Sequence, residues 1–320
     1  MTRTITAGLD GSPQSLAAAD WAAREARLRD LPLRLVSAWE WQPPAYAPAA
    51  GLGVPVPPSD LQRAGAQRLL DEARTRFARR LPGLRIDVED VPGSPVPALL
   101  KSSEDAELLV LGSRGLGQLT GFLLGSVSLS VLARCERPVV LVRPGGQWEE
   151  EPSPGHSASG LAAAPGHRDV VLGLDLHEPS SAVIDFAFDA ASRRAARLRI
   201  IHGWTLPPYH YGGELMPDLN DEMATQVRRE LSDVLRPWQE KYPAVEISPQ
   251  ATVGGAGRHL VDASQDAALV VVGRRIRRTA VGAHIGPVTQ ALLHHAAAPV
   301  AVIPHDPPAG PSASDLTAQA

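Results

Sequence analysis

Cysteine and strong net charge are what this chain lacks most clearly. The 320 residues include a single cysteine, Cys135, which can form no internal disulfide and leaves no cysteine pair to hold a metal ion. We therefore expect a reducing compartment. The 31 Lys and Arg stand against 35 Asp and Glu, for a net charge of −4. Composition thus gives no reason to expect nucleic acid or another polyanion as a partner.

Long apolar runs and metal motifs are missing as well. No stretch approaches the roughly 18 apolar residues of a membrane span. The N-terminal "MTRTITAGLDGS" has no apolar signal-peptide core, so we expect a cytoplasmic protein without membrane contact. His294 and His295 are adjacent and would point in different directions on a helix, which makes them poor metal partners. We predict no metal site built from protein side chains alone.

An internal repeat is the strongest signal that the chain does contain. "TITAGLDGS" returns as "DVVLGLDLH", "DAELLVLGSRG" as "DAALVVVGRRI", and "RPVVLVRP" as "APVAVIPH", in the same order. The repeat aligns Asp10 with Asp175, Trp39 with Trp204, Gly112 with Gly273, and Pro138 with Pro299. We therefore expect two copies of one domain, here called the first repeat (residues 1–143) and the second repeat (168–305).

The two remaining segments have a different composition. Residues 144–167 are rich in Pro, Gly, Ser and Ala, lack periodicity, and are predicted to be a flexible linker. The acidic run Glu149–Glu151 lies in this linker, where a solvated charge run is expected and a catalytic carboxylate pair is not. Residues 306–320 are predicted to be a disordered tail.

Within each repeat, short aliphatic runs alternate with helical patterns. In the first repeat "TITAGLD", "LRLVSAW", "RIDVEDV", "AELLVLGS" and "PVVLVRP" are predicted strands, with amphipathic helices between them. Such alternation is typical of a parallel sheet covered by helices on both faces. The predicted fold class is α/β, with two tandem Rossmann-like domains, each a five-stranded and mostly parallel sheet.

A glycine-rich stretch follows the fourth predicted strand. In a doubly wound sheet, ligands bind beyond the carboxyl ends of the strands, so Gly112 and Asp10 should be neighbours there. Glycines let backbone amides approach phosphate oxygens. Ser126 is predicted as the N-cap of the next helix, whose dipole would favour an anion, and Arg114 adds a positive charge. The alternative is that these glycines are turn residues only.

The spacing of these residues helps to decide between a phosphate-binding motif and simple turn residues. Gly112, Gly115, nine further residues and then Gly125-Ser126 is a specific pattern. It is no Walker loop, because no Gly-Lys-Ser/Thr follows, and no dinucleotide fingerprint, because the glycines follow the fourth strand. The pattern resembles the ATP-binding signature of the universal stress protein family, as do "GLDGS", "LVSAW" and "RPVVLV". The resemblance covers nearly the whole chain, twice.

This resemblance implies a tandem universal stress protein that binds ATP, together with Mg²⁺, as a stress-response regulator with slow or no hydrolysis. By matching position, Gly8 and Asp10 would border the adenosine and Ala38 would wall the adenine. The residues implied to wrap the phosphates are Leu111, Gly112, Ser113, Arg114, Gly115, Leu116, Gly117 and Gln118. Gly125, Ser126 and Val127 would hold the far end of the phosphates.

The second repeat departs from the pattern. Ile276 stands where the motif has its second glycine, and Pro287 stands in place of the serine. A β-branched residue crowds an approaching phosphate, and proline has neither amide donor nor hydroxyl. We predict that the first repeat binds ATP and that the second binds it poorly or not at all. A weak second site at Gly173, Asp175, Gly273 and Gly286 stays open.

Two features leave alternatives open. Arg274, Arg275, Arg277 and Arg278 form either a solvated loop, the favoured interpretation, or a site for another anion. Besides the ATP-binding regulator, the chain could be an ATP-using enzyme or a structural pairing module without a nucleotide. The closing strands of the two repeats are edge strands that need partners. We expect them to pair as a pseudo-dimer within one chain, and association of two chains stays open.

Overall fold

The computed structural model describes residues 3–39, 58–113, 125–145, 168–204, 217–276 and 285–306. Most of the predicted linker and tail, residues 146–167 and 307–320, lies outside this part of the chain, as do residues 114–124. Each repeat follows the predicted alternation of strands and helices.

The first repeat opens with a Rossmann-like succession of elements. Its elements are β1 (Thr4–Gly8), α1 (Pro13–Arg29), β2 (Leu33–Trp39), α2 (Pro58–Arg80), β3 (Ile86–Pro92), α3 (Pro95–Ser103), β4 (Ala106–Gly112), α4 (Ser126–Arg134) and β5 (Val139–Val142). The second repeat has β6 (Asp169–Gly173), α5 (Ser181–Arg194), β7 (Leu198–Trp204), α6 (Pro217–Lys241), β8 (Ile247–Val253), α7 (Ala256–Ala263), β9 (Ala267–Arg275), α8 (Pro287–His295) and β10 (Val300–His305).

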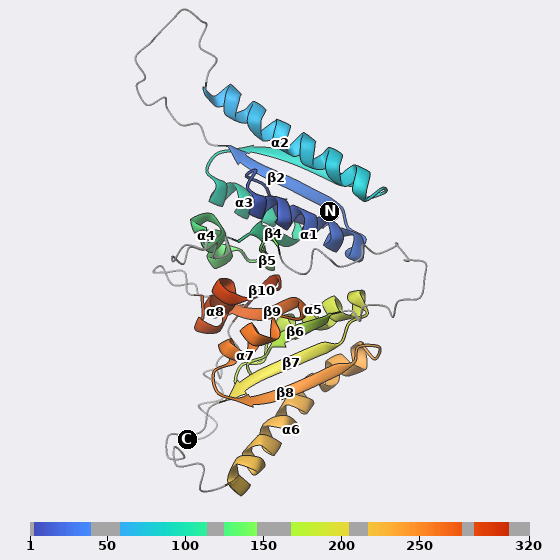
Figure 1. The fold of residues 1–320 in the computed structure, drawn as a ribbon, viewed down its shortest axis with the longest axis vertical. Coiled ribbons are helices and arrows are strands. Elements are labelled where there is room, and N and C mark those ends of the chain that lie inside the picture. Colours follow the sequence, from blue (N-terminus) through green and yellow to red (C-terminus); the bar gives the residue numbers. More distant parts are fainter. Residues whose placement is uncertain are drawn as a thin grey trace, which may run out of the picture.

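All ten strands belong to one sheet, which extends along the long axis of the molecule (Figure 1). The strand order is β3-β2-β1-β4-β5-β10-β9-β6-β7-β8, and all neighbours are parallel except β5 and β10. Val139 to Leu141 of β5 pair antiparallel with Val300 to Val302 of β10. The α/β class, the five parallel strands of each repeat and the pairing of the closing strands are therefore as predicted.

Helices cover both faces of this sheet and form two apolar layers. On one face α1, α2, α5 and α6 pack on the strands, with Phe77 and Phe188 among their fully buried side chains. On the other face the layer is formed by α3, α4, α7 and α8. Strands such as "LLVLG" are buried from both sides, which explains why they are continuous apolar runs without alternation.

Local signals fix the ends of the first helix. Ser12 is the N-cap of α1, and its hydroxyl accepts a hydrogen bond from the Ser15 amide at 3.2 Å. Pro13 occupies the first helical position, where a missing N–H costs nothing. Asp30 ends the helix in the left-handed region, with a φ of 53°. The start of α1 therefore lies directly after the carboxyl end of β1.

Charged side chains join the two repeats where α1 meets α5. Glu25 is 1% exposed, lies 2.5 Å from Arg29 (Oε1 to Nε), and also accepts a hydrogen bond from Arg194 of the second repeat. Arg29 reaches Asp189 at 2.9 Å. Burial favours protonation of Glu25, but Arg194 and Arg29 outweigh it and hold the pKa of Glu25 below its ordinary value. The interface thus contains a buried ionised carboxylate that bonds to both repeats.

The arginine run begins within β9, and its first member, Arg274, lies in the contact between the repeats, contrary to both interpretations from the sequence for this residue. Arg274 is 7% exposed and donates to the backbone oxygens of Ala133 at 3.1 Å and Cys135 at 2.5 Å, across the boundary between the repeats. It therefore satisfies carbonyls at the C-terminal end of α4 and is neither solvated nor free for an anion. Arg277 and Arg278 lie outside the described residues.

Candidate functional site

The candidate site lies where β1 and β4 run side by side in the first repeat. Ala7 pairs with Val110, so Gly8 and the residues after it lie next to the end of β4. The chain leaves β1 toward β2 on one side, while β4 flanks β1 on the other, so the strand order reverses here. The structure thus brings together Gly8, Asp10, Leu111, Gly112 and Ser113.

Asp10 is held in a defined orientation just beyond β1. One of its carboxylate oxygens accepts hydrogen bonds from the Ser12 amide at 2.9 Å and the Ser12 hydroxyl at 2.5 Å. Partial burial raises the pKa of Asp10, but the hydrogen bonds from Ser12 and Ser15 lower it by more. The pKa of Asp10 is therefore below its ordinary value. The side chain is exposed and ionised at neutral pH, as a carboxylate that faces a polar ligand group needs to be.

Gly112 allows the end of β4 to touch the first turn of α1. A Cβ on Gly112 would lie 2.5 Å from the carbonyl carbon of Gln14 and 2.8 Å from the amide nitrogen of Ser15. Gly8 is also closely packed, with Leu99 and Leu111 side-chain atoms 2.9 Å from the place of its missing Cβ. Part of the glycine pattern is therefore explained by backbone packing.

The N-terminus of α4 begins at the same end of the sheet. Gly125, and not Ser126 as predicted, is the N-cap, and Ser126 is the first helical residue. The prediction erred by one residue because a serine is a good cap in isolation, whereas here the turn is closed by the Leu129 amide on Gly125 O at 3.0 Å. Ser126 is exposed, and the first amides of the helix have no partner within the helix.

Ser128 connects this helix to the end of β4. Its hydroxyl donates to the Gly112 carbonyl at 2.9 Å, and the side chain is buried. The bond sets the N-terminus of α4 against β4 and so holds Gly125, Ser126 and Val127 beside Gly112. Reasoning from the sequence missed Ser128, although the repeat supplies a signal, since Thr289 occupies the matching place and contacts the Gly273 carbonyl at 3.5 Å.

The remaining predicted residues are placed in part. Ala38 lies near the end of β2, where it pairs with Val91 of β3, and it is partly exposed. It is therefore two strands away from Gly112 at the same end of the sheet. The predicted phosphate-wrapping residues Arg114, Gly115, Leu116, Gly117 and Gln118 lie outside the described part of the chain.

The corresponding place in the second repeat is built differently. β4 ends at Gly112, but β9 continues two residues past Gly273, to Arg275, because β10 is longer than β5. Pro304 and His305 pair with Arg274 and Arg275, and the Ile276 amide then donates to His305 O at 2.8 Å. The strand of the second repeat therefore includes Arg274 and Arg275, and the Ile276 amide that follows it is already engaged.

Side chains also occupy the equivalent of the candidate site in the second repeat. Arg275 forms an ion pair with Glu178 at 2.7 Å and lies 3.7 Å from Asp175, the counterpart of Asp10. The His305 ring lies against Gly273, with Nε2 2.9 Å from the place of a Cβ. Of the four residues of the weaker predicted site, Gly173 ends β6 and Asp175 follows it, Gly273 lies in β9, and Gly286 is the N-cap of α8.

The counterpart of Ala38 is also changed. Gly203 occupies its position, and a Cβ there would lie 2.6 Å from the Ala256 amide nitrogen. The turn between β8 and α7 therefore packs directly on the strand, where the first repeat carries a methyl group. Together with Arg275 and the longer β9, this leaves less open backbone at the second switch point.

Two further features of the described residues bear on function. No helix among them combines the length and the apolar character needed to cross a membrane. No group of three or more His, Cys, Asp and Glu side chains among them could hold a metal ion. Cys135 is a free, buried thiol, and its sulfur lies 3.4 Å from the Ser103 hydroxyl.

Comparison with known proteins agrees with this architecture. Universal stress protein Rv2623 of Mycobacterium tuberculosis (strain ATCC 25618 / H37Rv) is 35% identical over 306 residues, which cover 93% of this chain and 95% of that protein. Universal stress protein Rv2005c of the same strain is 34% identical over 309 residues, 93% of this chain and 96% of that protein.

A solved structure and a family model give the same result. A universal stress protein from Archaeoglobus fulgidus DSM 4304 shares the fold, with a TM-score of 0.62 at 16% identity over 95% of this chain and 99% of that chain. The model of the universal stress protein family matches residues 1–143 and again 166–304. The chain, with its repeated strand order, belongs to the universal stress protein family.

Proposed function

We propose that the first repeat binds ATP and that the bound nucleotide regulates a stress response. One observation carries this proposal: the paired ends of β1 and β4 bring Asp10 beside Gly112, and Ser128 fixes the N-terminus of α4 at the same place. An ionised carboxylate, a glycine backbone without a side chain and a helix N-terminus thus lie together where the strand order reverses. This is the place where α/β sheets bind ligands.

The parts of the site fit different parts of a nucleotide. Asp10 can accept hydrogen bonds from ribose hydroxyls, because hydrogen bonds from Ser12 hold it ionised and in place. The amides of Ser126 and Val127 can donate to phosphate oxygens. Ala38, at the end of β2, offers an apolar surface to the adenine. Gly115 and its neighbours are assigned to the phosphates by the resemblance to the universal stress protein motif.

Mg²⁺ would come with the nucleotide. Since the described residues contain no group of carboxylates able to hold a metal ion, the triphosphate would supply the main ligands.

A binding role is favoured over catalysis by the state of Asp10. A general base works best when its pKa lies near the operating pH, but the pKa of Asp10 is held below the ordinary value for aspartate. This carboxylate is therefore a weak base for activating water. We propose slow or no hydrolysis, so that occupancy of the site, and not turnover, is the signal.

The two repeats supply a matched pair of variants to test the proposal. Ser126→Pro copies the second repeat into the first and removes an amide donor and a hydroxyl, while Gly125 already has the extended backbone that precedes a proline (φ −55°, ψ 134°). We expect isothermal titration of the full chain with Mg-ATP to show one site, with affinity reduced at least about tenfold in Ser126→Pro, the loss of one hydrogen bond to a charged group.

Pro287→Ser is the control at the equivalent position. It should leave the first site unchanged, and it should create no second tight site, because Arg275 and the Ile276 amide remain engaged. Unchanged affinity in Ser126→Pro, or loss of ATP binding in Pro287→Ser with the first repeat intact, would contradict the proposal.

A further inference from the structure

The helix α4, which begins at the candidate site, is held at both of its ends. Near its start, the buried Ser128 hydroxyl donates to the Gly112 carbonyl of β4 at 2.9 Å. At its end, the Arg274 guanidinium donates to the Ala133 and Cys135 carbonyls at 3.1 Å and 2.5 Å. Arg274 belongs to β9 of the second repeat. The helix is thus fixed at one end by its own repeat and at the other end by the second repeat.

The antiparallel junction between the repeats explains how Arg274 reaches this helix. Val302 of β10 pairs with Val139, the first residue of β5. β9 is parallel to β10, and Arg274 pairs with Pro304, two residues further along β10. The carboxyl end of β9 therefore lies near the amino end of β5, into which α4 leads. Figure 1 shows α4 and α8 on either side of this junction.

The longer β9 of the second repeat is what supplies this arginine. Its counterpart in the first repeat, Ser113, follows the end of β4 and bonds back to its own repeat, with its amide on Val142 O at 2.8 Å. β9 instead continues to Arg275, which keeps Arg274 within the strand, and alternation places its side chain on the face that carries α4. The extension that distinguishes the second switch point from the first therefore also reaches the first repeat.

Arg274 occupies an expensive place for a guanidinium group. It is 7% exposed, and burial lowers its pKa below the ordinary arginine value. Among the described residues its charge is met by carbonyl oxygens, without an ion pair to a carboxylate. Burying a charge that has no ionic partner costs free energy. The contact therefore fixes α4 at an energetic cost.

We propose that Arg274 is a positioning residue for the phosphate end of the nucleotide in the first repeat, so that the second repeat completes a site that it does not line. The inference rests on the proposed function, in which the Ser126 and Val127 amides donate to phosphate oxygens. α4 has only nine residues and moves as a rigid rod, so a shift of its carboxyl end also moves these amides. Hydrogen bonds weaken steeply as distance and angle depart from their best values.

The helix α8 offers a matched contact that lies away from the proposed nucleotide site. Its Leu293 carbonyl accepts a hydrogen bond at 2.6 Å from Arg143, which follows β5 in the first repeat. α8 begins at Pro287, where we expect no tight nucleotide binding. Replacing Arg143 therefore removes a bond between the repeats of the same kind, from a helix that the nucleotide is not expected to contact.

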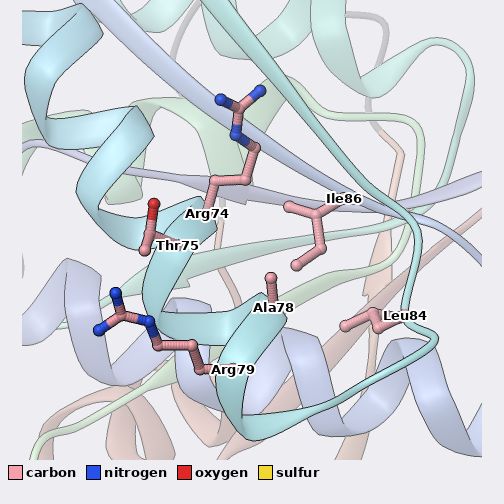
Figure 2. Close-up of a pocket in the computed structure, with 6 residues that line it drawn as sticks. All are labelled: Arg74, Thr75, Ala78, Arg79, Leu84 and Ile86. Carbon is pink, nitrogen blue, oxygen red and sulfur yellow. The ribbon is translucent and has the colours of Figure 1, made fainter.

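Arginines elsewhere in the first repeat supply a second control, because a triphosphate is attracted to any exposed guanidinium group. A groove of about 460 Å³ lies between the C-terminal half of α2 and the start of β3 (Figure 2), and its lining residues are Arg74, Thr75, Ala78, Arg79, Leu84 and Ile86. It adjoins the amino end of β3, whereas Gly112 is the carboxyl end of β4, so the groove and the candidate site lie at opposite ends of the parallel strands. Arg74→Ala/Arg79→Ala removes two positive charges without changing the candidate site.

The test is isothermal titration of the full chain with Mg-ATP, together with adenosine measured by competition. Arg274→Met keeps most of the side-chain volume and removes the guanidinium donors. We expect affinity for Mg-ATP to fall at least about threefold, which is part of the effect of one hydrogen bond to a charged group. Affinity for adenosine should stay unchanged, because adenosine has no phosphate. Arg143→Met and Arg74→Ala/Arg79→Ala should leave both affinities unchanged.

Hydrogen exchange without nucleotide measures the position of the helix independently of ATP. Arg274→Met should speed exchange of the α4 amides from Leu129 to Cys135 at least about threefold and leave α8 unchanged, and Arg143→Met should do the reverse. Far-ultraviolet circular dichroism verifies that each variant is folded.

The outcomes separate this inference from the proposed function. Wild-type affinity for Mg-ATP in Arg274→Met, an equal loss of affinity for adenosine, or unchanged exchange in α4 overturns the inference and leaves the proposed function standing. An equal loss of Mg-ATP affinity in Arg143→Met also overturns it, because the effect would then belong to any bond between the repeats. Absence of Mg-ATP binding by the wild type contradicts the proposed function, and the inference with it.

Discussion

The switch points of the two repeats have the same strand order but different surroundings. In the first, β4 stops at Gly112, and a carboxylate and a helix N-terminus lie beside its end. In the second, β9 continues to Arg275, which bonds to the counterpart of that carboxylate and to Glu178. Duplication therefore preserved the sheet while a longer strand and one ion pair changed the ligand end. A fold and its site can diverge separately, because the core does not depend on these residues.

The contact between the repeats shows a second asymmetry within a near-symmetric pair. Arg29 lies over the ring of Phe186, and Arg194 lies over the ring of Trp21, which are equivalent positions in the repeat. Glu25, however, has Ala190 as its counterpart. A single buried carboxylate thus pairs with both arginines. Two copies of the second repeat would have alanine at both equivalent positions and would lack this carboxylate.

The largest expected effect comes from removing that carboxylate. Glu25→Ala leaves Arg194 without its buried partner and Arg29 with Asp189 alone, and breaking a buried pair on one side typically costs about 3–5 kcal/mol. We expect the free energy of unfolding in urea to fall by this amount.

Moving the carboxylate across the pseudo-two-fold axis is the control. In Glu25→Ala/Ala190→Glu, the new side chain lies four residues before Arg194 and faces Arg29, the mirror image of the original arrangement. We expect it to restore at least half of the lost stability. A double variant no more stable than Glu25→Ala would show that the site of the carboxylate, and not its charge alone, is what the interface requires.

The next largest effect is a difference in stability loss between alanine substitutions of Gly112 in β4 and Gly273 in β9. Gly112→Ala pushes a methyl group to 2.5 Å from the backbone of Gln14, which is fixed in α1, so we expect a loss of about 3 kcal/mol. Gly273→Ala meets the ring of His305 at 2.9 Å and Val183 at 3.2 Å, both side chains that can shift, so we expect a loss of about 1 kcal/mol or less. Thermal unfolding of the two variants measures the difference, and equal losses would contradict it.

The smallest expected effect is a dependence of the free energy of unfolding on pH below 4.5. The pKa of Glu25 is lowered in the folded protein, so its contribution is complete above the ordinary value of 4.5 and is lost as the pH falls through the lower folded value. Below pH 4.5, wild-type stability should therefore fall more steeply than that of Glu25→Gln, by up to about 1.4 kcal/mol per pH unit. Urea unfolding at pH 3.5 to 6 tests this, and parallel pH profiles would exclude Glu25 as the titrating group.

Much of the fold was predictable because its signals are local or repeated. Continuous apolar strands, helix periodicity and the order of recurring segments gave the α/β class, the two repeats and the neighbouring positions of Asp10 and Gly112. Pairing of the closing strands was expected because an unpaired edge is unfavourable. These signals depend on chemistry that each segment carries by itself.

The errors and omissions share a different cause. Ser126 was predicted as a cap, but the Leu129 amide bonds to Gly125 O, a contact that residue type alone does not reveal. Arg274 was read as part of a loop because its partners, the carbonyls of Ala133 and Cys135, are about 140 residues away in the other repeat. Ser128 was missed because its acceptor, Gly112 O, lies in another element.

The amino-acid sequence by itself determined the family, the doubled α/β architecture and the loss of Gly and Ser from the second motif, because these are properties of residue order. Tertiary structure alone decided that β9 continues past Gly273 to Arg275 at the second switch point, and that Glu25 serves two arginines from different repeats. The reason is physical: such contacts form between atoms that are distant in the chain, and no local pattern encodes their meeting.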